Sequence, residues 1–245
     1  MNVLEVEGLR KVYPSFTLQD VSFSVPQGAI MGFIGRNGAG KSTTLKSILG
    51  LVHPEAGTVR WCGEDVKSSE KTFKESIGVV LGGVDFYPRK KLRTITDVTK
   101  KFYPNWDEAK YQHYCKLFSL DSEKRVDQLS SGMKIKYLIA LALSHNARLL
   151  ILDEPTSGLD PVSRDELVTL FRGIVADGTR SILFSTHITS DLEKCASHIA
   201  FIKDGAIVHT GTVADFMTAY ADKGTTLEEI IVSVERRELD DGAII

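Results

Sequence analysis

The chain has 245 residues, of which 42% are hydrophobic and 25% charged, and its formal net charge is -2. This length suffices for one large domain or a domain with an inserted subdomain, and the near-neutral charge excludes the basic surface typical of nucleic-acid-binding proteins. No apolar run approaches the roughly 20 residues of a membrane-spanning helix, and the first residues carry no signal peptide. We therefore expect a cytoplasmic protein with no nucleic-acid partner and no direct membrane insertion.

Three segments near the start of the chain alternate between polar and apolar residues and predict short strands of a small antiparallel sheet. They are residues 3–6, 16–25 and 57–61. Between the second and third segments, the apolar residues 29–34 predict a strand buried on both faces, and a helix is predicted over 41–51.

The junction of this buried strand and its helix carries the P-loop pattern, GxxxxGK followed by Ser or Thr. The matching residues are Gly35, Arg36, Asn37, Gly38, Ala39, Gly40, Lys41 and Ser42, with Thr43 directly after them. Glycines let backbone N–H groups converge on one anion, and the helix N-terminus adds partial positive charge. Lys41 can reach the β and γ phosphates of ATP and the Ser42 hydroxyl can bind Mg²⁺. The pattern predicts a nucleoside triphosphate site.

A mostly helical stretch follows between about residues 85 and 147, after a short apolar strand at 77–81. Helices are predicted over residues 94–102, 107–118 and 131–144, which indicates a helical subdomain inserted into an α/β core. The last of these helices opens with Leu129-Ser130-Ser131-Gly132-Met133. Taken alone, Ser130 there is a typical N-cap residue.

Two acids end the next apolar strand, residues 149–152. A buried parallel strand delivers Asp153 to the sheet edge beside the P-loop, where it can hold Mg²⁺ directly or through water. Glu154 comes next and could accept a proton from an attacking water molecule. A third apolar strand at 181–184 and helices over 161–176 and 189–196 complete a strand-then-helix order, which is typical of a mostly parallel sheet.

The order of P-loop, Ser130-Ser131-Gly132 stretch and acidic strand end resembles the ATP-binding cassette (ABC) family. In that family the signature stretch reaches the γ-phosphate held by the opposite subunit, so the resemblance implies a dimer of cassettes, expected to be a homodimer. This chain departs from the common signature at Ser131, which replaces a Gly, and at Met133, which replaces a Gln.

Three more residues match the family over residues 1–220. Asp160, in Ser157-Gly158-Leu159-Asp160, resembles the D-loop that crosses the dimer interface. His187 follows the third apolar strand as the family's switch histidine does, and Tyr13 matches the aromatic residue on which adenine stacks. From residue type alone, the alternatives are that His187 is a structural histidine and that Tyr13 is an ordinary aromatic residue of an edge strand.

One family position is altered. The Gln that normally follows the strand before the helical subdomain, where it binds Mg²⁺ and senses the membrane partner, is replaced here by Gly82. Glycine offers no ligand, so we expect intact ATP binding with modest turnover. Asp85 is a candidate substitute.

The resemblance implies a P-loop NTPase core with a mostly parallel sheet, an antiparallel β-subdomain and an inserted helical subdomain. The expected units are residues 1–84 with 148–222, the helical 85–147, and a tail at 223–245. The implied function is ATP hydrolysis, with Mg²⁺, for a membrane-spanning permease subunit. Residues 102–107 and 129–134 resemble an exporter subgroup that includes exporters of amphipathic peptides such as phenol-soluble modulins. The alternatives are a soluble non-transport ABC ATPase and a weakly hydrolysing regulatory clamp.

Overall fold

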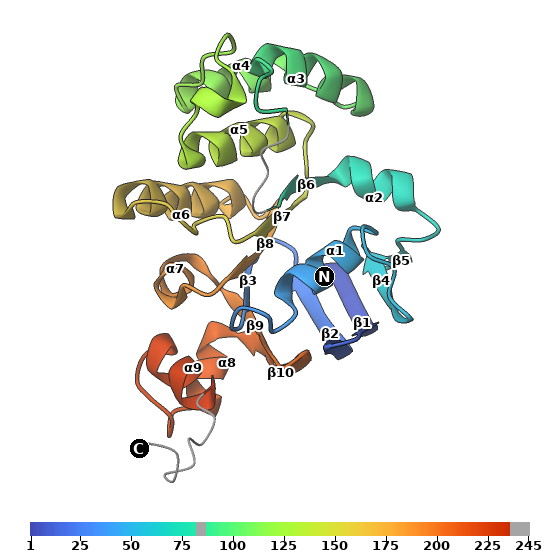
Figure 1. The fold of residues 1–245 in the computed structure, drawn as a ribbon, viewed down its shortest axis with the longest axis vertical. Coiled ribbons are helices and arrows are strands. Elements are labelled where there is room, and N and C mark those ends of the chain that lie inside the picture. Colours follow the sequence, from blue (N-terminus) through green and yellow to red (C-terminus); the bar gives the residue numbers. More distant parts are fainter. Residues whose placement is uncertain (82–86, 236–245) are drawn as a thin grey trace.

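The computed structural model describes residues 1–81 and 87–235, and two sheets form its framework (Figure 1). The larger sheet has six strands in the order β10-β9-β3-β8-β7-β6. Its strands are β3 (Ile30–Ile34), β6 (Ile77–Val80), β7 (Leu149–Asp153), β8 (Ser181–Thr186), β9 (His198–Lys203) and β10 (Ala206–Thr212). Only the β9–β10 pair is antiparallel. The prediction of a mostly parallel sheet is confirmed.

Both faces of this sheet are buried, which explains the continuous apolar runs in its central strands. Side chains of a strand alternate between faces. Accordingly, Ile30 and Ile34 of β3 join a core with the helices α5 (Ser131–Ser144) and α6 (Pro161–Val175), whereas Met31 and Phe33 join the core on the opposite face. The helices that follow β3, β7 and β8 along the chain are α1 (Lys41–Ile48), α6 (Pro161–Val175) and α7 (Thr189–Cys195). They match the predicted helices, each one to three residues shorter.

The smaller sheet is antiparallel, as predicted, and has the order β2-β1-β4-β5. Its strands are β1 (Asn2–Tyr13), β2 (Phe16–Pro26), β4 (Ala56–Trp61) and β5 (Glu64–Asp65). The first strand runs much further than the predicted residues 3–6, because its pairing with β2 continues to Tyr13 opposite Phe16. Helix α2 (Glu70–Ser76) then leads to β6. The apolar face of this sheet shares its core with Met31 and Phe33.

Five helices joined by short loops form the described part of the predicted helical subdomain, which lies at one end of the molecule (Figure 1). They are α3 (Leu92–Thr99), η1 (Lys100–Phe102), α4 (Glu108–Leu117), η2 (Val126–Gln128) and α5 (Ser131–Ser144). A buried hydroxyl network joins three of them, because Thr96 Oγ1 donates to Tyr111 Oη at 2.8 Å and lies 2.9 Å from Tyr137 Oη. The apolar residues of this helical subdomain are continuous with the core on one face of the large sheet. The domain boundaries stay predictions.

A glycine lets α5 rest directly on the edge strand β6. A Cβ atom at Gly78 would lie 2.3 Å from the Cβ of Ala142. Real Cβ atoms do not approach one another so closely, so any side chain here would push the helix away from the sheet. Gly78 therefore fixes where the helical end meets the core.

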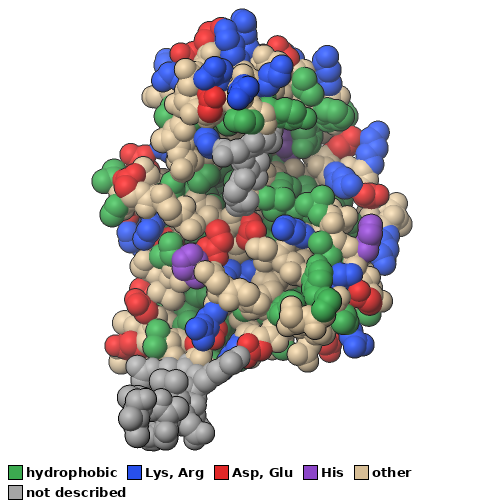
Figure 2. Space-filling view, in the orientation of Figure 1, with side chains coloured by type: hydrophobic (Ala, Val, Ile, Leu, Met, Phe, Trp, Pro, Cys, Tyr) green, Lys and Arg blue, Asp and Glu red, His purple; other side chains and the backbone are tan. Residues whose placement is uncertain are grey.

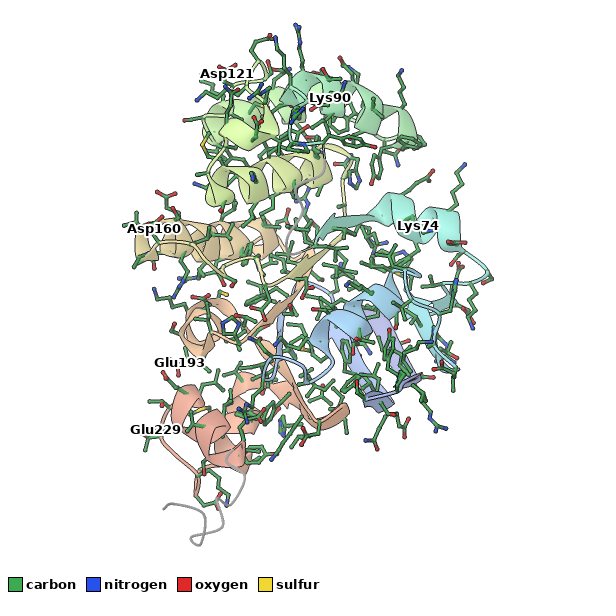
Figure 3. All side chains as sticks on the ribbon, viewed as in Figure 1. Lys74, Lys90, Asp121, Asp160, Glu193 and Glu229 are labelled. Carbon is green, nitrogen blue, oxygen red and sulfur yellow. The ribbon has the colours of Figure 1, made fainter. Side chains whose placement is uncertain are left out.

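The chain after β10 folds onto α7 through two further helices, α8 (Val213–Ala219) and α9 (Leu227–Glu235). Figure 3 shows Glu193 of α7 and Glu229 of α9 on the same side of this end of the molecule. The Leu227 N–H donates to Glu193 Oε1 at 2.9 Å, and Lys203 Nζ donates to the Val234 carbonyl oxygen at 2.6 Å. Residues 227–235 of the predicted tail therefore form a docked helix. Among the described residues no helix is long and apolar enough to cross a membrane.

Candidate active site

The loop between β3 and α1 curls around the ammonium group of Lys41. Gly38 and Gly40 have φ values of 86° and 114°, a region that favours glycine. At Gly35 a Cβ atom would lie 2.2 Å from the Ile202 carbonyl oxygen, so a side chain there would displace β9. Lys41 Nζ donates to the Gly35 carbonyl oxygen at 2.7 Å. The segment therefore forms a tight cradle at the N-terminus of α1.

The other predicted residues of this loop line the same turn. Arg36, Asn37 and Gly38 are exposed at its tip, Ala39 and Gly40 are buried behind it, and Ser42 and Thr43 are half-buried in the first turn of α1. Exposed backbone at the tip leaves N–H groups open to a phosphate, which is what the pattern requires.

Asp153 ends β7 beside this cradle, as the sequence predicts. It is only 7% exposed. Its Oδ1 atom accepts hydrogen bonds from Ser42 Oγ at 3.1 Å and from Ser185 Oγ at 2.6 Å. Ser42 and Asp153 thus bring two oxygen ligands together from segments 111 residues apart. Oxygen atoms are the ligands that Mg²⁺ prefers, so this pair fits that ion.

Glu154 lies between two basic groups. Its Oε1 atom is 3.2 Å from Lys41 Nζ and its Oε2 atom is 2.8 Å from His187 Nδ1. Only 21% of the Glu154 side chain is exposed, and its backbone has the positive φ of 50°. A partly buried carboxylate in contact with a histidine can accept and pass on a proton.

The remaining predicted site residues lie on other elements. Ser130 caps α5 by accepting the Met133 N–H at 3.2 Å. Asp160 caps α6 by accepting two N–H groups at 3.0 Å, and Figure 3 shows it at the outer end of that helix. Tyr13 is 37% exposed at the end of β1, with Lys11 Nζ 5.6 Å from its ring centre. Within the described residues, no hydrogen bond or ion pair joins these three to the P-loop.

Ser131 and Gly132 open α5, where Ser131 is exposed and Gly132 half-buried. A Cβ atom at Gly132 would lie 3.7 Å from Ser163 Cβ, so the first turns of α5 and α6 lie side by side. Ser130 and Asp160 therefore cap neighbouring helices. Ser130 and Ser131 are exposed at this capped helix start, and a helix N-terminus is a site that favours phosphate.

Comparison with known proteins identifies the family of this chain. The ABC transporter family profile matches residues 18–157, from β2 through the P-loop to just past Glu154. The chain belongs to the ABC transporter family. It is an ATP-binding and ATP-hydrolysing transporter subunit, and cassettes of this family dimerise and work with a membrane permease.

Individual relatives cover most of this ABC subunit. Bacitracin transport ATP-binding protein BcrA of Bacillus licheniformis is 34% identical over 84% of this chain and 68% of its own length. Nod factor export ATP-binding protein I of Burkholderia orbicola is 35% identical over 78% of this chain and 64% of its own. The solved ATP-binding subunit of an ABC transporter superposes with a TM-score of 0.84 at 29% identity, covering 96% of this chain and all of that one.

A cassette solved as a dimer in a post-hydrolysis state with ADP and Pi has the same fold. Its TM-score is 0.75 at 20% identity, over 86% of this chain and 98% of the other.

Sequence reasoning missed Ser185 in this ABC site. Its hydroxyl donates to Asp153 and also accepts the Glu154 N–H at 2.9 Å. The only signal in the sequence is a polar residue near the end of an otherwise apolar strand. The contact depends on the register of β7 against β8, which pairs Asp153 with Ser185.

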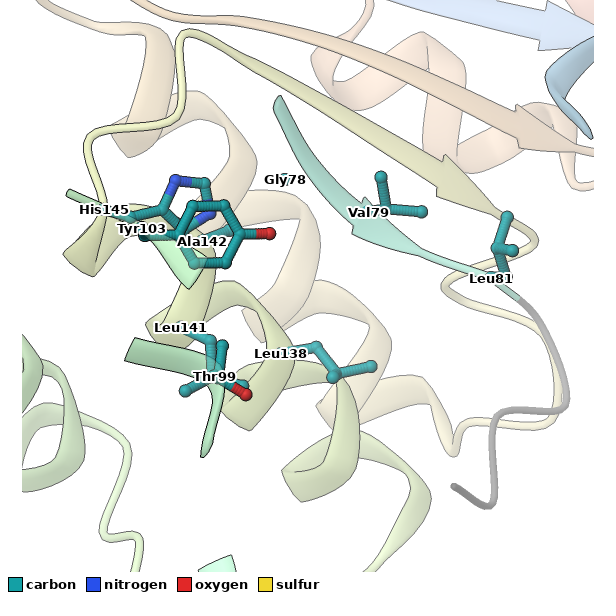
Figure 4. A pocket seen from close by; sticks show the side chains of 9 residues that line it. All are labelled: Gly78, Val79, Leu81, Thr99, Tyr103, Leu138, Leu141, Ala142 and His145. Atoms are coloured by element: carbon teal, nitrogen blue, oxygen red, sulfur yellow. The ribbon is translucent and has the colours of Figure 1, made fainter. Parts of the chain in front are cut away.

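A hollow lies where the helical end meets β6 (Figure 4). Its volume is about 270 Å³, and it is lined by Gly78, Val79, Leu81, Thr99, Tyr103, Leu138, Leu141, Ala142 and His145. The Tyr103 ring stacks on the His145 ring, with centres 3.7 Å apart and planes 12° apart. Burial lowers the pKa of His145 to about 4, so its imidazole is neutral at pH 7.

An adjoining hollow of about 590 Å³ shares Thr99 and Tyr103 with the first. Its lining includes the exposed side chains Tyr87, Val98 and Phe102, which are 67%, 52% and 71% exposed. Figure 2 shows hydrophobic side chains at this end of the molecule, bordered by Lys and Arg side chains. Large exposed apolar groups gathered in one place are typical of protein–protein contact sites. The family's Gln position, Gly82, and Asp85 lie outside the described residues.

Proposed function

We propose that Glu154 is the general base of ATP hydrolysis in this chain and that Ser42 and Asp153 hold the Mg²⁺ ion. Glu154 accepts a proton from water, whose oxygen bonds to the γ-phosphorus as the bond to the β-phosphate oxygen breaks, giving ADP and phosphate. When bound, Mg²⁺ supplies positive charge that offsets the charge developing on the phosphate oxygens. The supporting observation is the convergence of Lys41, Asp153, Glu154 and His187 at one sheet edge.

His187 and Lys41 have complementary roles in this proposal. His187 orients the Glu154 carboxylate through the 2.8 Å contact and can hydrogen-bond the γ-phosphate with its other ring nitrogen. Lys41 binds the β and γ phosphates, which compete with Glu154 for its ammonium group. ATP binding thereby releases the Glu154 carboxylate from Lys41.

The second half of each site comes from another copy of the chain, so the proposed functional unit is a homodimer. Ser130, Ser131 and Gly132 would bind the γ-phosphate held by the opposite subunit, and Asp160 would lie at the interface. The adjacent, capped starts of α5 and α6 support this arrangement. Adenine would stack on Tyr13, whose exposed ring lies at the end of β1. Loss of the γ-phosphate then removes interface contacts and opens the dimer.

The membrane permease would dock on the hollow around Phe102 and Tyr103, placing the chain on the cytoplasmic face without inserting it into the membrane. Exposed Val98 and Phe102 offer apolar anchors for an amphipathic helix of the permease, and Lys90 in the same lining offers a positive charge. Relatives named for Nod factor export and bacitracin transport support export as the direction. We propose amphipathic peptides as the exported class, based on the resemblance of residues 102–107 and 129–134.

The test is the rate of ATP hydrolysis by the purified chain and by Glu154→Gln. The amide is a poor base of nearly the same shape, so we expect kcat to fall by at least about a hundredfold while ATP binding persists. Glu55→Gln, which removes an exposed carboxylate paired with Lys11, is the control and should keep the wild-type rate. A Glu154→Gln variant with wild-type kcat would contradict the proposal.

A further inference from the structure

One buried serine connects the two acids of the active site. Ser185 lies on β8 with none of its surface exposed. Its hydroxyl donates to Asp153 Oδ1 at 2.6 Å and accepts the Glu154 N–H at 2.9 Å. We infer that Ser185 is a positioning residue for ATP hydrolysis, which holds both acids in their working orientations. This inference rests on the roles proposed for Asp153 and Glu154.

Glu154 needs such support because of its backbone conformation. Its φ of 50° lies in the left-handed region, which residues with a side chain adopt at a cost. Neighbouring structure must therefore hold it there. The Glu154 N–H lies 2.9 Å from the Ser185 hydroxyl and 3.2 Å from the Ser185 carbonyl oxygen, so one residue supplies both partners.

Asp153 is held by two hydroxyl groups with different surroundings. Ser42 is half-buried in the cradle, and in the proposed function its hydroxyl turns to Mg²⁺. Ser185 is fixed opposite Asp153 by the parallel register of β7 and β8, inside the sheet. When Ser42 changes partner, the bond from Ser185 still orients the carboxylate. A rigid second partner of this kind is what keeps a metal ligand in place.

The same strand offers a matched control at its other end. Ser181 is equally buried, donates to the Pro26 carbonyl oxygen at 3.1 Å and accepts the Gly28 N–H at 3.0 Å. Like Ser185, it donates one hydrogen bond and accepts one from a backbone N–H, but its acceptor is a carbonyl oxygen and it lies four residues earlier on β8, at the strand's opposite end from the acids. Replacing either serine with alanine removes one buried hydroxyl from the same strand.

The experiment compares kcat, the KM for ATP, the Mg²⁺ dependence and the thermal midpoint of Ser185→Ala, Ser181→Ala and Ser185→Thr. For Ser185→Ala we expect kcat to fall about ten- to hundredfold, since small misplacements of catalytic groups have effects of this size. Its KM for ATP should change less than about threefold, because the P-loop is untouched. Ser181→Ala should keep kcat despite a similar drop in thermal midpoint, and Ser185→Thr, which retains the hydroxyl, should recover most of the lost rate.

A fall in kcat that Ser181→Ala reproduces would overturn the inference, as would a Ser185→Ala variant with wild-type kcat. Measuring Glu154→Gln in the same assay distinguishes failure of the role inferred for Ser185 from failure of the proposed function. If Glu154→Gln is inactive while Ser185→Ala is unimpaired, only the role of Ser185 is wrong. If Glu154→Gln remains fully active, the assignment of the base is itself wrong.

Discussion

The nucleotide edge of the sheet and the hollow at the helical end are built by opposite means. At the nucleotide edge, buried polar groups bond to partners on neighbouring strands and loops, as Asp153 does to its two serine hydroxyls. At the helical end, large apolar groups such as Phe102 stand exposed beside a stacked Tyr103–His145 pair. The first arrangement holds reacting groups still, whereas the second leaves apolar surface to be covered. In the proposed function, ATP hydrolysis and docking of the permease therefore occupy separate surfaces.

The largest expected effect is at the nucleotide edge. Asp153→Asn keeps the shape of the side chain but removes the charge that the proposed Mg²⁺ site depends on. We expect the Mg²⁺ concentration for half-maximal hydrolysis to rise by at least about a hundredfold. Nucleotide binding measured in the presence of EDTA should change little, because Lys41 and the P-loop backbone remain. An unchanged Mg²⁺ dependence of hydrolysis would show that Asp153 does not bind the metal ion.

A smaller effect is expected at the helical end, where binding rather than chemistry should change. Phe102→Asp places a charge in the proposed docking hollow, and we expect at least about a tenfold loss of permease recovered with the tagged chain from membranes. Leu117→Asp is the matched control, since Leu117 is 58% exposed on α4 and does not line the hollow. ATP hydrolysis by the purified chain should be the same in both variants. Equal permease recovery by the two variants would refute the docking site.

The smallest effect concerns stability and pH at His145. Its pKa is lowered from 6.5 to about 4 in the folded chain, so between these values only the unfolded chain binds the proton. The contribution of the neutral His145 imidazole to the free energy of unfolding is therefore fully present above pH 6.5 and is lost as the pH falls toward 4. Between pH 7.5 and pH 5 the free energy of unfolding should fall by about 2 kcal/mol more in the wild type than in His145→Phe. Urea unfolding at the two pH values measures this, and equal losses would contradict the buried neutral imidazole.

Much of the fold could be predicted from the sequence because its central strands and their helices carry strong local patterns. Strand β3, residues 149–152 of β7 and residues 182–184 of β8 are continuous apolar runs, since both faces of the sheet are buried. Strands β9 and β10 and helix α8 were not predicted. In β9 only a four-residue apolar run lies between His198 and Lys203, and short runs of this kind do not distinguish strand from helix.

For the site, local motifs predicted the residues but not all of their contacts. The P-loop and Asp153-Glu154 are read from consecutive residues, and the structure brings them together. The contacts of Ser185 depend on the register between two strands that are far apart in the chain, which no local pattern encodes. The role of Ser130 in a second subunit's site stays a prediction, since its only hydrogen bonds among the described residues cap α5.

The most direct test is the molar mass of purified Glu154→Gln at saturating Mg-ATP, measured by light scattering. If two chains share each nucleotide and cannot hydrolyse it, the mass should be twice the 27.0 kDa of one chain and should return to one chain with ADP. Ser130→Phe, which fills the proposed phosphate-binding turn, should prevent the dimer while each chain still binds ATP. A Glu154→Gln chain that binds ATP yet remains a monomer would contradict the account.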